Sequence, residues 1–254
     1  MVEKTFEKEW KVNSFRFTFF PCSGFEFDEN QWLELIGTPP ENVSFKYKSQ
    51  IRHFDGIYDS GNFVVDTDPS RVHFVFVPNK EAHEITDSPL HLGDYEESAS
   101  IFNTLLNKWF SLPGGPEVKR IAIGAQLFNP VSSRAQGYQK LQEYLQESVK
   151  IDIENSFDFS YSINRPRKTE FINKELIINR LTKWSVTRVQ MQLQNTGVKD
   201  PLSSVVSEEF VVSLELDINT YEEYRGNFSL EEQKLMSQQL FALGKEISEK
   251  GDIK

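Results

Sequence analysis

The segment from residue 120 to residue 148 reads RIAIGAQLFNPVSSRAQGYQKLQEYLQES and lies at the midpoint of the chain. Its first part, Ile121 to Phe128, is the most sustained uncharged run in the sequence, and Pro130 ends this run. The second part has apolar residues at helical spacing, namely Tyr138, Leu141 and Leu145. The segment therefore predicts a strand of about 118–128, followed by an amphipathic helix of about 135–148.

The two faces of this predicted strand differ in the size of their side chains. Ile121 and Ile123 fall on one face, whereas Ala122 and Gly124 fall on the other. Because small residues in a strand let another backbone approach closely, we expect a helix to pack on the face that carries Ala122 and Gly124. A larger side chain at Gly124 would then overpack this seam.

A strong break, Pro-Gly-Gly-Pro at 113–116, precedes this segment. On each side of the break the apolar pattern predicts the same order of elements: strand, helix, three strands, helix. The first set spans about 10–112 and the second about 118–250. We therefore predict an α+β fold of two strand-helix-three-strand-helix units, with mostly antiparallel sheets covered by helices.

The predicted units are residues 1–113 and residues 117–254, either as two small domains or packed as one. The matching order of elements indicates a pseudo-duplication. A short echo, NSFRFTF at 13–19 and NSFDFSY at 155–161, is out of register with that match. Similar strand composition explains the echo equally well.

Phenylalanine is unusually frequent, with 21 residues against 3 methionines. Many phenylalanines alternate along the chain, as Phe15, Phe17 and Phe19 do, which is the spacing of one strand face. This pattern predicts a strand-rich core. Three predicted helix starts resemble capping boxes: Asp28 with Gln31, Asp94 with Glu97, and Ser229 with Glu232.

The formal net charge is −10, and the sequence pI is about 5.0. A surface of this charge repels a polyanion, so nucleic acid is an unfavourable partner unless a local basic patch overrides the repulsion. The single cysteine, Cys22, excludes an internal disulfide and a cysteine-based metal site. The charged start MVEKTFEKEW and the lack of a long apolar run predict a cytoplasmic protein without a membrane segment.

Two histidines and several carboxylates gather at residues 81–94 and form a candidate metal site. Its candidate ligands are His83, His91 and Asp94. Imidazole and carboxylate groups bind divalent cations, but this spacing matches no known ligand pattern. A solvated acidic loop explains the same residues.

The tripeptide Glu117-Val118-Lys119 is a candidate catalytic group at the start of the central strand. Metal-dependent nucleases place carboxylates that hold Mg²⁺ beside a lysine in this way. Such a site needs an upstream aspartate, for which Asp94 is the candidate. A solvated strand entry is the alternative interpretation.

Arg165, Arg167 and Lys168 form a basic turn, and they could join Lys46, Lys48 and Arg52 in a patch for an anion or a partner. A solvated turn is the alternative. Glu215 and Asp217 lie two residues apart on an outward strand face, as paired catalytic acids would, although strand alternation alone produces this pattern. The sequence has no nucleophile elbow, phosphate loop, dinucleotide fingerprint or His-Glu-x-x-His motif.

The strand that starts Arg120-Ile121-Ala122-Ile123 and runs to Asn129 resembles the hallmark strand of a sporadically distributed, functionally uncharacterised bacterial family. In that family an Arg-Ile-Gly-Leu-Arg-Tyr-type strand leads to an asparagine. Gly124-Ala125 stands where the second arginine would be. The resemblance implies a bacterial cytoplasmic protein from mobile or defence-associated gene neighbourhoods, and it implies no known activity.

Three functions follow from these patterns. The first is a non-catalytic interaction or regulatory module without a cofactor, which binds a protein partner or a second copy of itself. The second is a metal-dependent hydrolase or nuclease that uses His83, His91, Glu117 and Lys119. The third is a small-ligand-binding protein whose sheets curve around an apolar pocket lined by phenylalanines.

Overall fold

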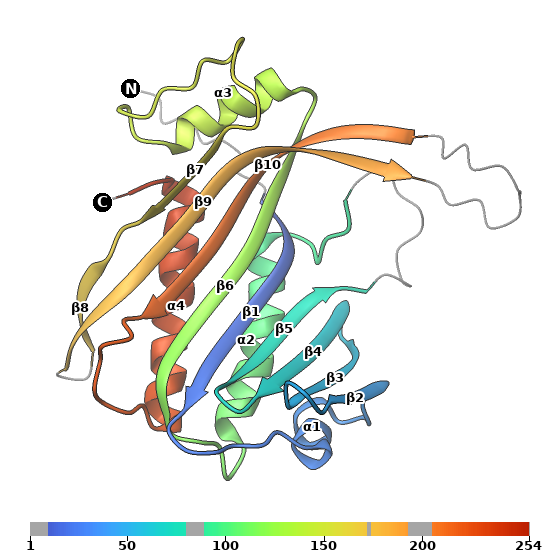
Figure 1. The fold of residues 1–254 in the computed structure, drawn as a ribbon, viewed down its shortest axis with the longest axis vertical. Coiled ribbons are helices and arrows are strands. Elements are labelled where there is room, and N and C mark those ends of the chain that lie inside the picture. The colour runs from blue at the N-terminus through green and yellow to red at the C-terminus, as the bar shows by residue number, and fades with distance from the viewer. Residues whose placement is uncertain (1–9, 80–88, 172–173, 193–204, 254) are drawn as a thin grey trace, which may run out of the picture.

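Ten strands form one antiparallel sheet in this computed structural model, which describes residues 10–79, 89–171, 174–192 and 205–253. The strand order is β2-β3-β4-β5-β1-β6-β10-β9-β7, and β8 also pairs with β9. Four helices accompany the sheet, which gives the predicted α+β class (Figure 1). None of the helices within these ranges is long and apolar enough to cross a membrane.

Each half of the chain contributes a strand, a helix, four strands and a second helix. The first half provides β1 (Lys11–Pro21), α1 (Glu29–Ile36), β2 (Asn42–Lys46), β3 (Ile51–Tyr58), β4 (Gly61–Asp68), β5 (Arg71–Pro78) and α2 (Tyr95–Ser111). The second half provides β6 (Val118–Val131), α3 (Arg134–Tyr144), β7 (Ser160–Asn164), β8 (Arg167–Phe171), β9 (Lys174–Gln192), β10 (Val205–Thr220) and α4 (Leu230–Lys250).

The predicted count of three strands between the two helices of each half is wrong, because both halves have four. In the first half the sequence pattern lets one strand run on from about residue 43 through residue 52. The structure instead turns at 47–50, where Gln50 has a φ of 53°, and this turn separates β2 from β3. In the second half β7 and β8 are separate short strands that both pair with the long β9.

The two predicted units share the sheet, because β1 and β6 pair at its centre. Phe19 lies opposite Ile121, and Lys11 lies opposite Phe128. Outward from this central pair, β1 is followed by β5, β4, β3 and β2, whereas β6 is followed by β10, β9 and then β7 or β8.

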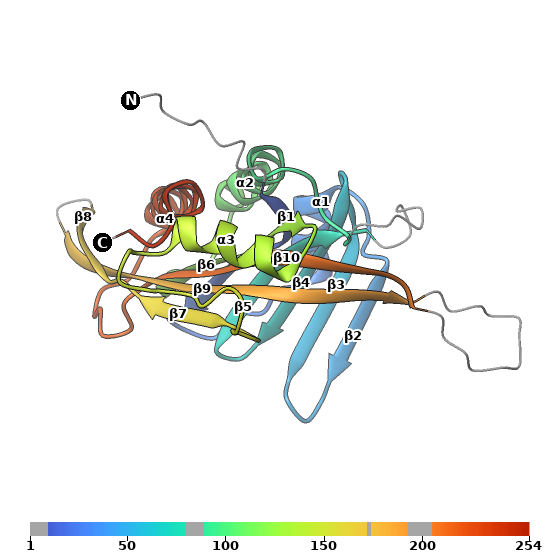
Figure 2. The same ribbon diagram turned by 90° about the horizontal axis from the view of Figure 1, so that it is seen from above.

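The helices cover one face of the sheet, and the phenylalanines of that face form the core (Figure 2). Phe15, Phe17 and Phe19 on β1 are fully buried. Phe15 stacks on Phe102 of α2, with ring centroids 5.9 Å apart. Each buried side chain of this size contributes about 1.5–3 kcal/mol, so the central strands and α2 hold one another in place.

Two of the three predicted capping boxes form. Asp28 with Gln31 caps α1, and Ser229 with Glu232 caps α4. The Asp94 side chain makes no cap hydrogen bond at α2. Its carboxylate instead accepts a hydrogen bond from Lys11 Nζ at 2.5 Å, which ties the start of α2 to β1.

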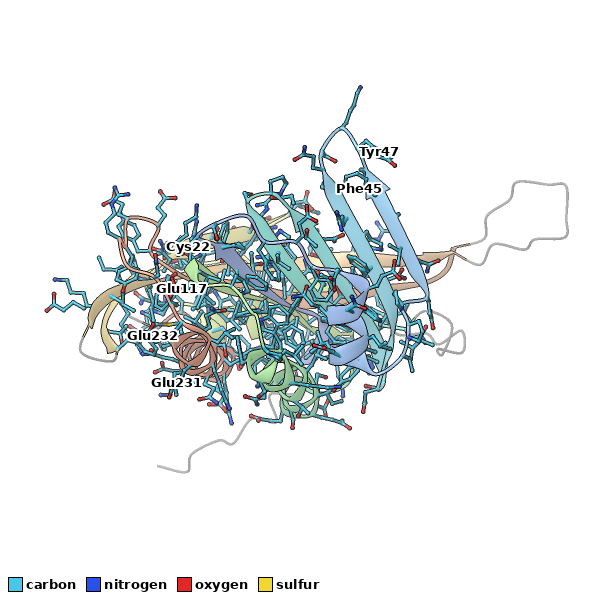
Figure 3. All side chains as sticks on the ribbon, turned by 90° about the horizontal axis from the view of Figure 1, so that it is seen from below. Cys22, Phe45, Tyr47, Glu117, Glu231 and Glu232 are labelled. Carbon is cyan, nitrogen blue, oxygen red and sulfur yellow. The ribbon has the colours of Figure 1, made fainter. Side chains whose placement is uncertain are left out.

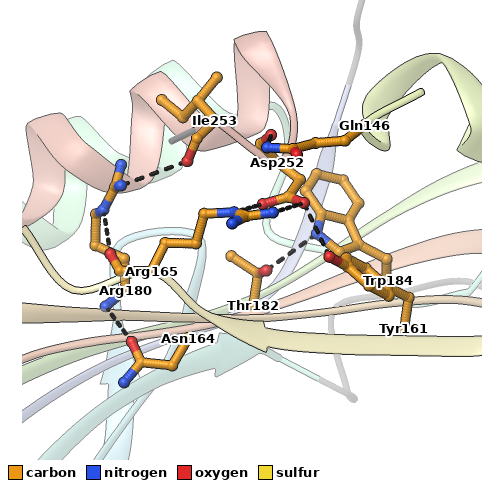
Figure 4. Close-up of polar contacts among 9 residues, drawn as sticks. All are labelled: Gln146, Tyr161, Asn164, Arg165, Arg180, Thr182, Trp184, Asp252 and Ile253. Atoms are coloured by element: carbon orange, nitrogen blue, oxygen red, sulfur yellow. Dashed lines mark hydrogen bonds and ion pairs between the residues drawn. The ribbon is translucent and has the colours of Figure 1, made fainter. Parts of the chain in front are cut away.

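The residues that follow α4 are fixed by an ion pair between the buried Asp252 and the half-buried Arg165 (Figure 4). Arg165 Nη2 donates to Asp252 Oδ2 at 2.8 Å, and the Tyr161 hydroxyl donates to the same oxygen at 3.1 Å. Arg180 donates to the carbonyl oxygens of Arg165 and Ile253. We call this group the Asp252 clasp; it ties the end of α4 to β7 and β9.

Two opposing effects act on the pKa of Asp252. Burial raises the pKa. The opposing effect is larger: hydrogen bonds from Arg165 and Tyr161, together with the positive charges of Arg165 and Arg180, lower the pKa, so the net shift is downward. A carboxylate whose pKa is lowered in the folded state stabilises the fold at pH values above its pKa in the unfolded chain, which is about 3.9. This contribution is lost as the pH falls through the folded-state pKa.

We predict that Asp252→Ala lowers the free energy of unfolding by about 2 kcal/mol at neutral pH, because it leaves the half-buried Arg165 without its charged partner and removes the hydrogen bonds from Arg165 and Tyr161. Urea denaturation measures this loss. The control Lys250→Ala removes only an exposed helix pair and should change little. The difference in the free energy of unfolding between wild type and Asp252→Ala should become smaller as the pH falls below about 4. A difference that stays constant would contradict the role assigned to this carboxylate.

Candidate functional site

Within the residues that the structure describes, the helices lie on one face of the sheet, and we call the opposite face the open face (Figure 2). Strand alternation sorts the side chains between the two faces. On β10, Leu214 and Leu216 are buried in the core, whereas Glu215 and Asp217 point to the open face and are about half exposed. The open face is therefore polar where the helix-covered face is aromatic.

Small residues on the central strand β6 form the floor of the open face. Ala122 and Gly124 lie there, and the guanidinium group of Arg16 crosses Gly124. A Cβ atom added to Gly124 would lie 3.1 Å from Arg16 Nη2. The predicted helix packing on this face is wrong, because the helices cover the face of Ile121 and Ile123, where more apolar surface is buried.

A hollow of about 450 Å³ lies over this floor, and we call it the charged hollow. Its charged lining residues come from three strands: Arg16 from β1, Lys183 from β9, and Glu215 and Asp217 from β10. Gly124 of β6 lies beneath them. Arg16 Nη2 lies 3.4 Å from Asp217 Oδ2, and Lys183 Nζ lies 2.8 Å from Glu215 Oε1. All four charged side chains are 41–48% exposed, so they can also reach a bound partner.

A ladder of amide side chains holds Asp217 in position. Asn219 Nδ2 donates to Asp217 Oδ1 at 2.8 Å. Asn219 Oδ1 in turn accepts from Arg120 Nη2 at 3.0 Å and from Asn179 Nδ2 at 3.1 Å. Because Asn219 is only 4% exposed, this ladder fixes one wall of the charged hollow rather than offering free donors to a ligand.

A second polar row crosses β1, β5, β4 and β3. His73 Nδ1 and Thr18 Oγ1 lie 2.8 Å apart, and His53 Nδ1 lies 2.8 Å from Asp66 Oδ1. Burial lowers the pKa of His73, and the nearby charges of Arg71 and Arg16 lower it further. A hydroxyl beside a neutral imidazole is the arrangement of an activated nucleophile, but Thr18 is 3% exposed, so this hydroxyl is shielded from a substrate.

A smaller hollow of about 240 Å³ adjoins the charged hollow and shares Gln126 and Glu215 with it. Its remaining lining is largely apolar and includes Phe128, Val189 and Val211. We call it the apolar hollow. The two hollows together place charged groups and an apolar surface next to each other along β6 and β10.

The candidate metal and catalytic residues do not meet in one place. Asp94 lies beside Lys11 and His91 beside Phe128, at one end of the β1–β6 pair. Glu117 and Lys119 lie at the other end, beside Cys22 (Figure 3). Lys119 and Phe128 are nine residues apart on β6, which at about 3.3 Å per residue is roughly 30 Å.

His83 is outside the described residues. Within the described ranges, no group of three or more histidine, cysteine, aspartate or glutamate side chains is arranged to hold a metal ion.

The basic turn is used within the fold. Arg165 binds Asp252, and Arg167 Nη1 lies 3.0 Å from Glu246 Oε2, so only Lys168 of the three has its charge directed to solvent. Lys46 lies on β2, at the other end of the strand order from β7 and β8. The structure therefore does not bring the two basic groups into one patch.

Sequence patterns singled out Glu215 and Asp217 but missed their partners Arg16 and Lys183. Both cations were visible as polar residues on alternating strands. Their convergence was not, because it depends on β1, β6, β10 and β9 being neighbours.

Comparison of the chain with protein-family models, with curated proteins and with solved structures finds no match. The resemblance of residues 120–129 to a bacterial family thus stays a prediction.

We predict that Gly124→Val changes the free energy of unfolding by less than about 1 kcal/mol, because only the flexible Arg16 side chain must move. The contrasting variant is Gly61→Val, whose Cβ would lie 2.7 Å from the Val77 carbonyl oxygen and should lose at least about 3 kcal/mol. Urea denaturation of both variants tests this. Equal losses would show that Gly124 is covered by more than Arg16.

Proposed function

We propose that this protein is a non-catalytic binding module whose open face binds an extended segment of a protein partner. The observation that carries this proposal is the pair of adjoining hollows that share Gln126 and Glu215. One hollow offers both signs of charge, and the other offers an apolar surface. A segment that carries charged residues beside an apolar residue complements both.

The length of the surface fits a short peptide. Val211 of the apolar hollow and Asp217 of the charged hollow lie on the same strand, β10. At about 3.3 Å per residue they are roughly 20 Å apart, which corresponds to about six residues of an extended chain.

The charges favour a partner of mixed sign. Arg16 and Lys183 are already paired with Asp217 and Glu215, so a ligand with one charge would gain one contact and leave a carboxylate or a cation without its partner. A segment with both signs can pair with all four groups. Non-specific binding of nucleic acid is disfavoured by the net charge of −10.

The position of the site also favours the predicted pseudo-duplication. Strand order is matched for the three strands nearest the centre on each side, β1-β5-β4 and β6-β10-β9, and the charged hollow takes Arg16 from β1 and Asp217 from β10, across that boundary. We infer that the site arose where two repeated units meet. The bacterial, cytoplasmic and defence-associated setting remains a prediction from the resemblance of residues 120–129.

A small-ligand-binding protein is the second candidate, because the charged hollow has the volume of known ligand sites, which is roughly 300–1,000 Å³. Its lining is charged, whereas the sequence predicted an apolar pocket lined by phenylalanines. The phenylalanines of β1 and β5 pack into the core against α2, on the other face of the sheet.

We test the proposal with a phage library of random heptapeptides panned against the full chain. We expect selected peptides to carry both charge signs next to an apolar residue. The exchange Lys183→Glu with Glu215→Lys keeps the ion pair but reverses its direction, so it should weaken peptide binding at least tenfold, which is about 1.4 kcal/mol.

The matched control is the exchange Lys245→Glu with Glu96→Lys, which reverses an ion pair on the helix-covered side and should leave peptide affinity unchanged. Calorimetry measures both affinities. A library without enriched peptides, or equal affinities for wild type and the open-face exchange, would refute the proposal. A metabolite that raises the melting temperature of wild type, but not of the open-face exchange, would favour the small-ligand alternative.

A further inference from the structure

The strand β2 is an uncovered edge of the sheet. It is the last strand of the order, β3 is its only partner among the strands that the structure describes, and all five of its residues are exposed. Its outer side therefore presents backbone N–H and C=O groups that can pair with another strand. The opposite edge differs, because Tyr161 and Ile163 of β7 are half buried, and Tyr161 packs against the core.

Apolar side chains are concentrated at this edge. Val43 is 49% exposed, Phe45 is 41% exposed, and Tyr47 in the following turn is 85% exposed. Phe45 and Tyr47 are in contact, with ring centroids 4.7 Å apart, and both lie at the tip of the β2–β3 hairpin (Figure 3). The adjacent helix α1 covers β3 and β4, where Trp32 contacts Phe54 and Phe63, so these outer aromatic rings lie beyond its cover.

Natural edge strands are usually blocked by proline, by charged residues or by a bulge. Pro39 and Pro40 precede β2 but do not interrupt it, and its residues Asn42-Val43-Ser44-Phe45-Lys46 include one charge. An exposed apolar edge of this kind is an interaction surface.

We propose that β2 pairs antiparallel with β2 of a second copy of this chain, with Ser44 on the two-fold axis. Ser44 is the central residue of the strand, so this register uses its whole length. It places Val43 opposite Phe45 of the second copy, and Asn42 opposite Lys46. A two-fold pairing makes each contact twice, and apolar cross-strand pairs stabilise antiparallel strands.

Charge supports a second copy as the occupant. Lys46 makes no ion pair with any residue in the described ranges. Asp55 lies beside Asn42 on β3, accepts a hydrogen bond from Asn42 Nδ2 at 3.2 Å, and keeps 18% of its side chain exposed. In the proposed register Lys46 of the second copy stands two strands, or about 10 Å, from Asp55 on the same face of the sheet, which a lysine side chain can span.

The same register avoids repulsion between like charges. The whole chain carries a net charge of −10, but β2 has no acidic residue. The two Lys46 side chains would lie at opposite ends of the paired strands. The net charge therefore opposes association only at long range, where salt screens it.

Sedimentation velocity of the full chain over a hundredfold range of concentration tests the proposal. We expect a reversible monomer–dimer equilibrium. Lys46→Glu should weaken dimerisation at least tenfold, because it places a second carboxylate near Asp55. Lys48→Glu, in the turn beyond β2, makes the same change of charge outside the paired strands and should have no effect.

Reversal of both charges distinguishes loss of the contact between Lys46 and Asp55 from a general effect of Lys46→Glu on the fold. The double variant Lys46→Glu with Asp55→Lys should recover most of the affinity that Lys46→Glu loses. Melting temperatures establish that each variant is folded before it is compared. A monomer at every concentration, or a dimer that Lys46→Glu leaves unchanged, overturns the proposal.

Disulfide cross-linking tests the two-fold register directly. Directly opposed Cα atoms of antiparallel strands are about 4.5–5.5 Å apart, which a disulfide can bridge. In a Cys22→Ser background, Ser44→Cys should therefore form a covalent dimer on mild oxidation. The control Ser60→Cys, in the exposed turn between β3 and β4, should not; equal rates for the two variants would contradict the register.

Discussion

The antiparallel pairing of β1 with β6 is the interaction on which the rest of the structure depends. It joins the two halves of the chain in one sheet and aligns Phe15, Phe17 and Phe19 with Ala125, Ile123 and Ile121 on the helix-covered face. The same register aligns Arg16 with Gly124 on the open face. One set of backbone hydrogen bonds therefore fixes both the aromatic core and the floor of the charged hollow.

The two faces serve different purposes because their side chains differ in size and polarity. The aromatic face excludes water and supplies most of the burial that stabilises the fold. The open face has small residues at its centre, with ion pairs and amides around them. It therefore has hollows, and its charged side chains stay exposed to solvent. The Asp252 clasp and the amide ladder around Asn219 hold the strands that carry the charged groups. A surface fixed in this way loses little side-chain entropy when a partner binds.

Local patterns in the sequence predicted where helices and strands form better than they predicted how these elements pack against one another. The strand that became β6, the helix that became α3, and the capping boxes of α1 and α4 follow from apolar spacing and cap residues that lie within a few positions of each other. The turn at 47–50 was missed because it has no glycine or proline, and Gln50 takes the left-handed conformation instead. Alternation also separated the faces of β6 correctly, but residue size alone did not say which face the helices cover.

Pairings between distant residues left no signal in the sequence. Arg165 was read as part of an exposed basic turn, but its partner Asp252 lies 87 residues away along the chain. Arg16 and Asp217 meet across an even longer separation, 201 residues. Which charges are neutralised and which remain for a partner depends on strand order, and a single sequence does not determine that order.

The central position of the β1–β6 pair also has a consequence for the order of folding. The strands β2 to β5 are joined by short turns, so they can pair early through local contacts. Phe19 and Ile121, by contrast, are about one hundred residues apart in the chain, and closing so long a loop is slow. The middle of the sheet is therefore expected to form last. Until it does, the phenylalanines of β1 stay exposed to solvent, and the first half of the chain is most prone to aggregation during that interval.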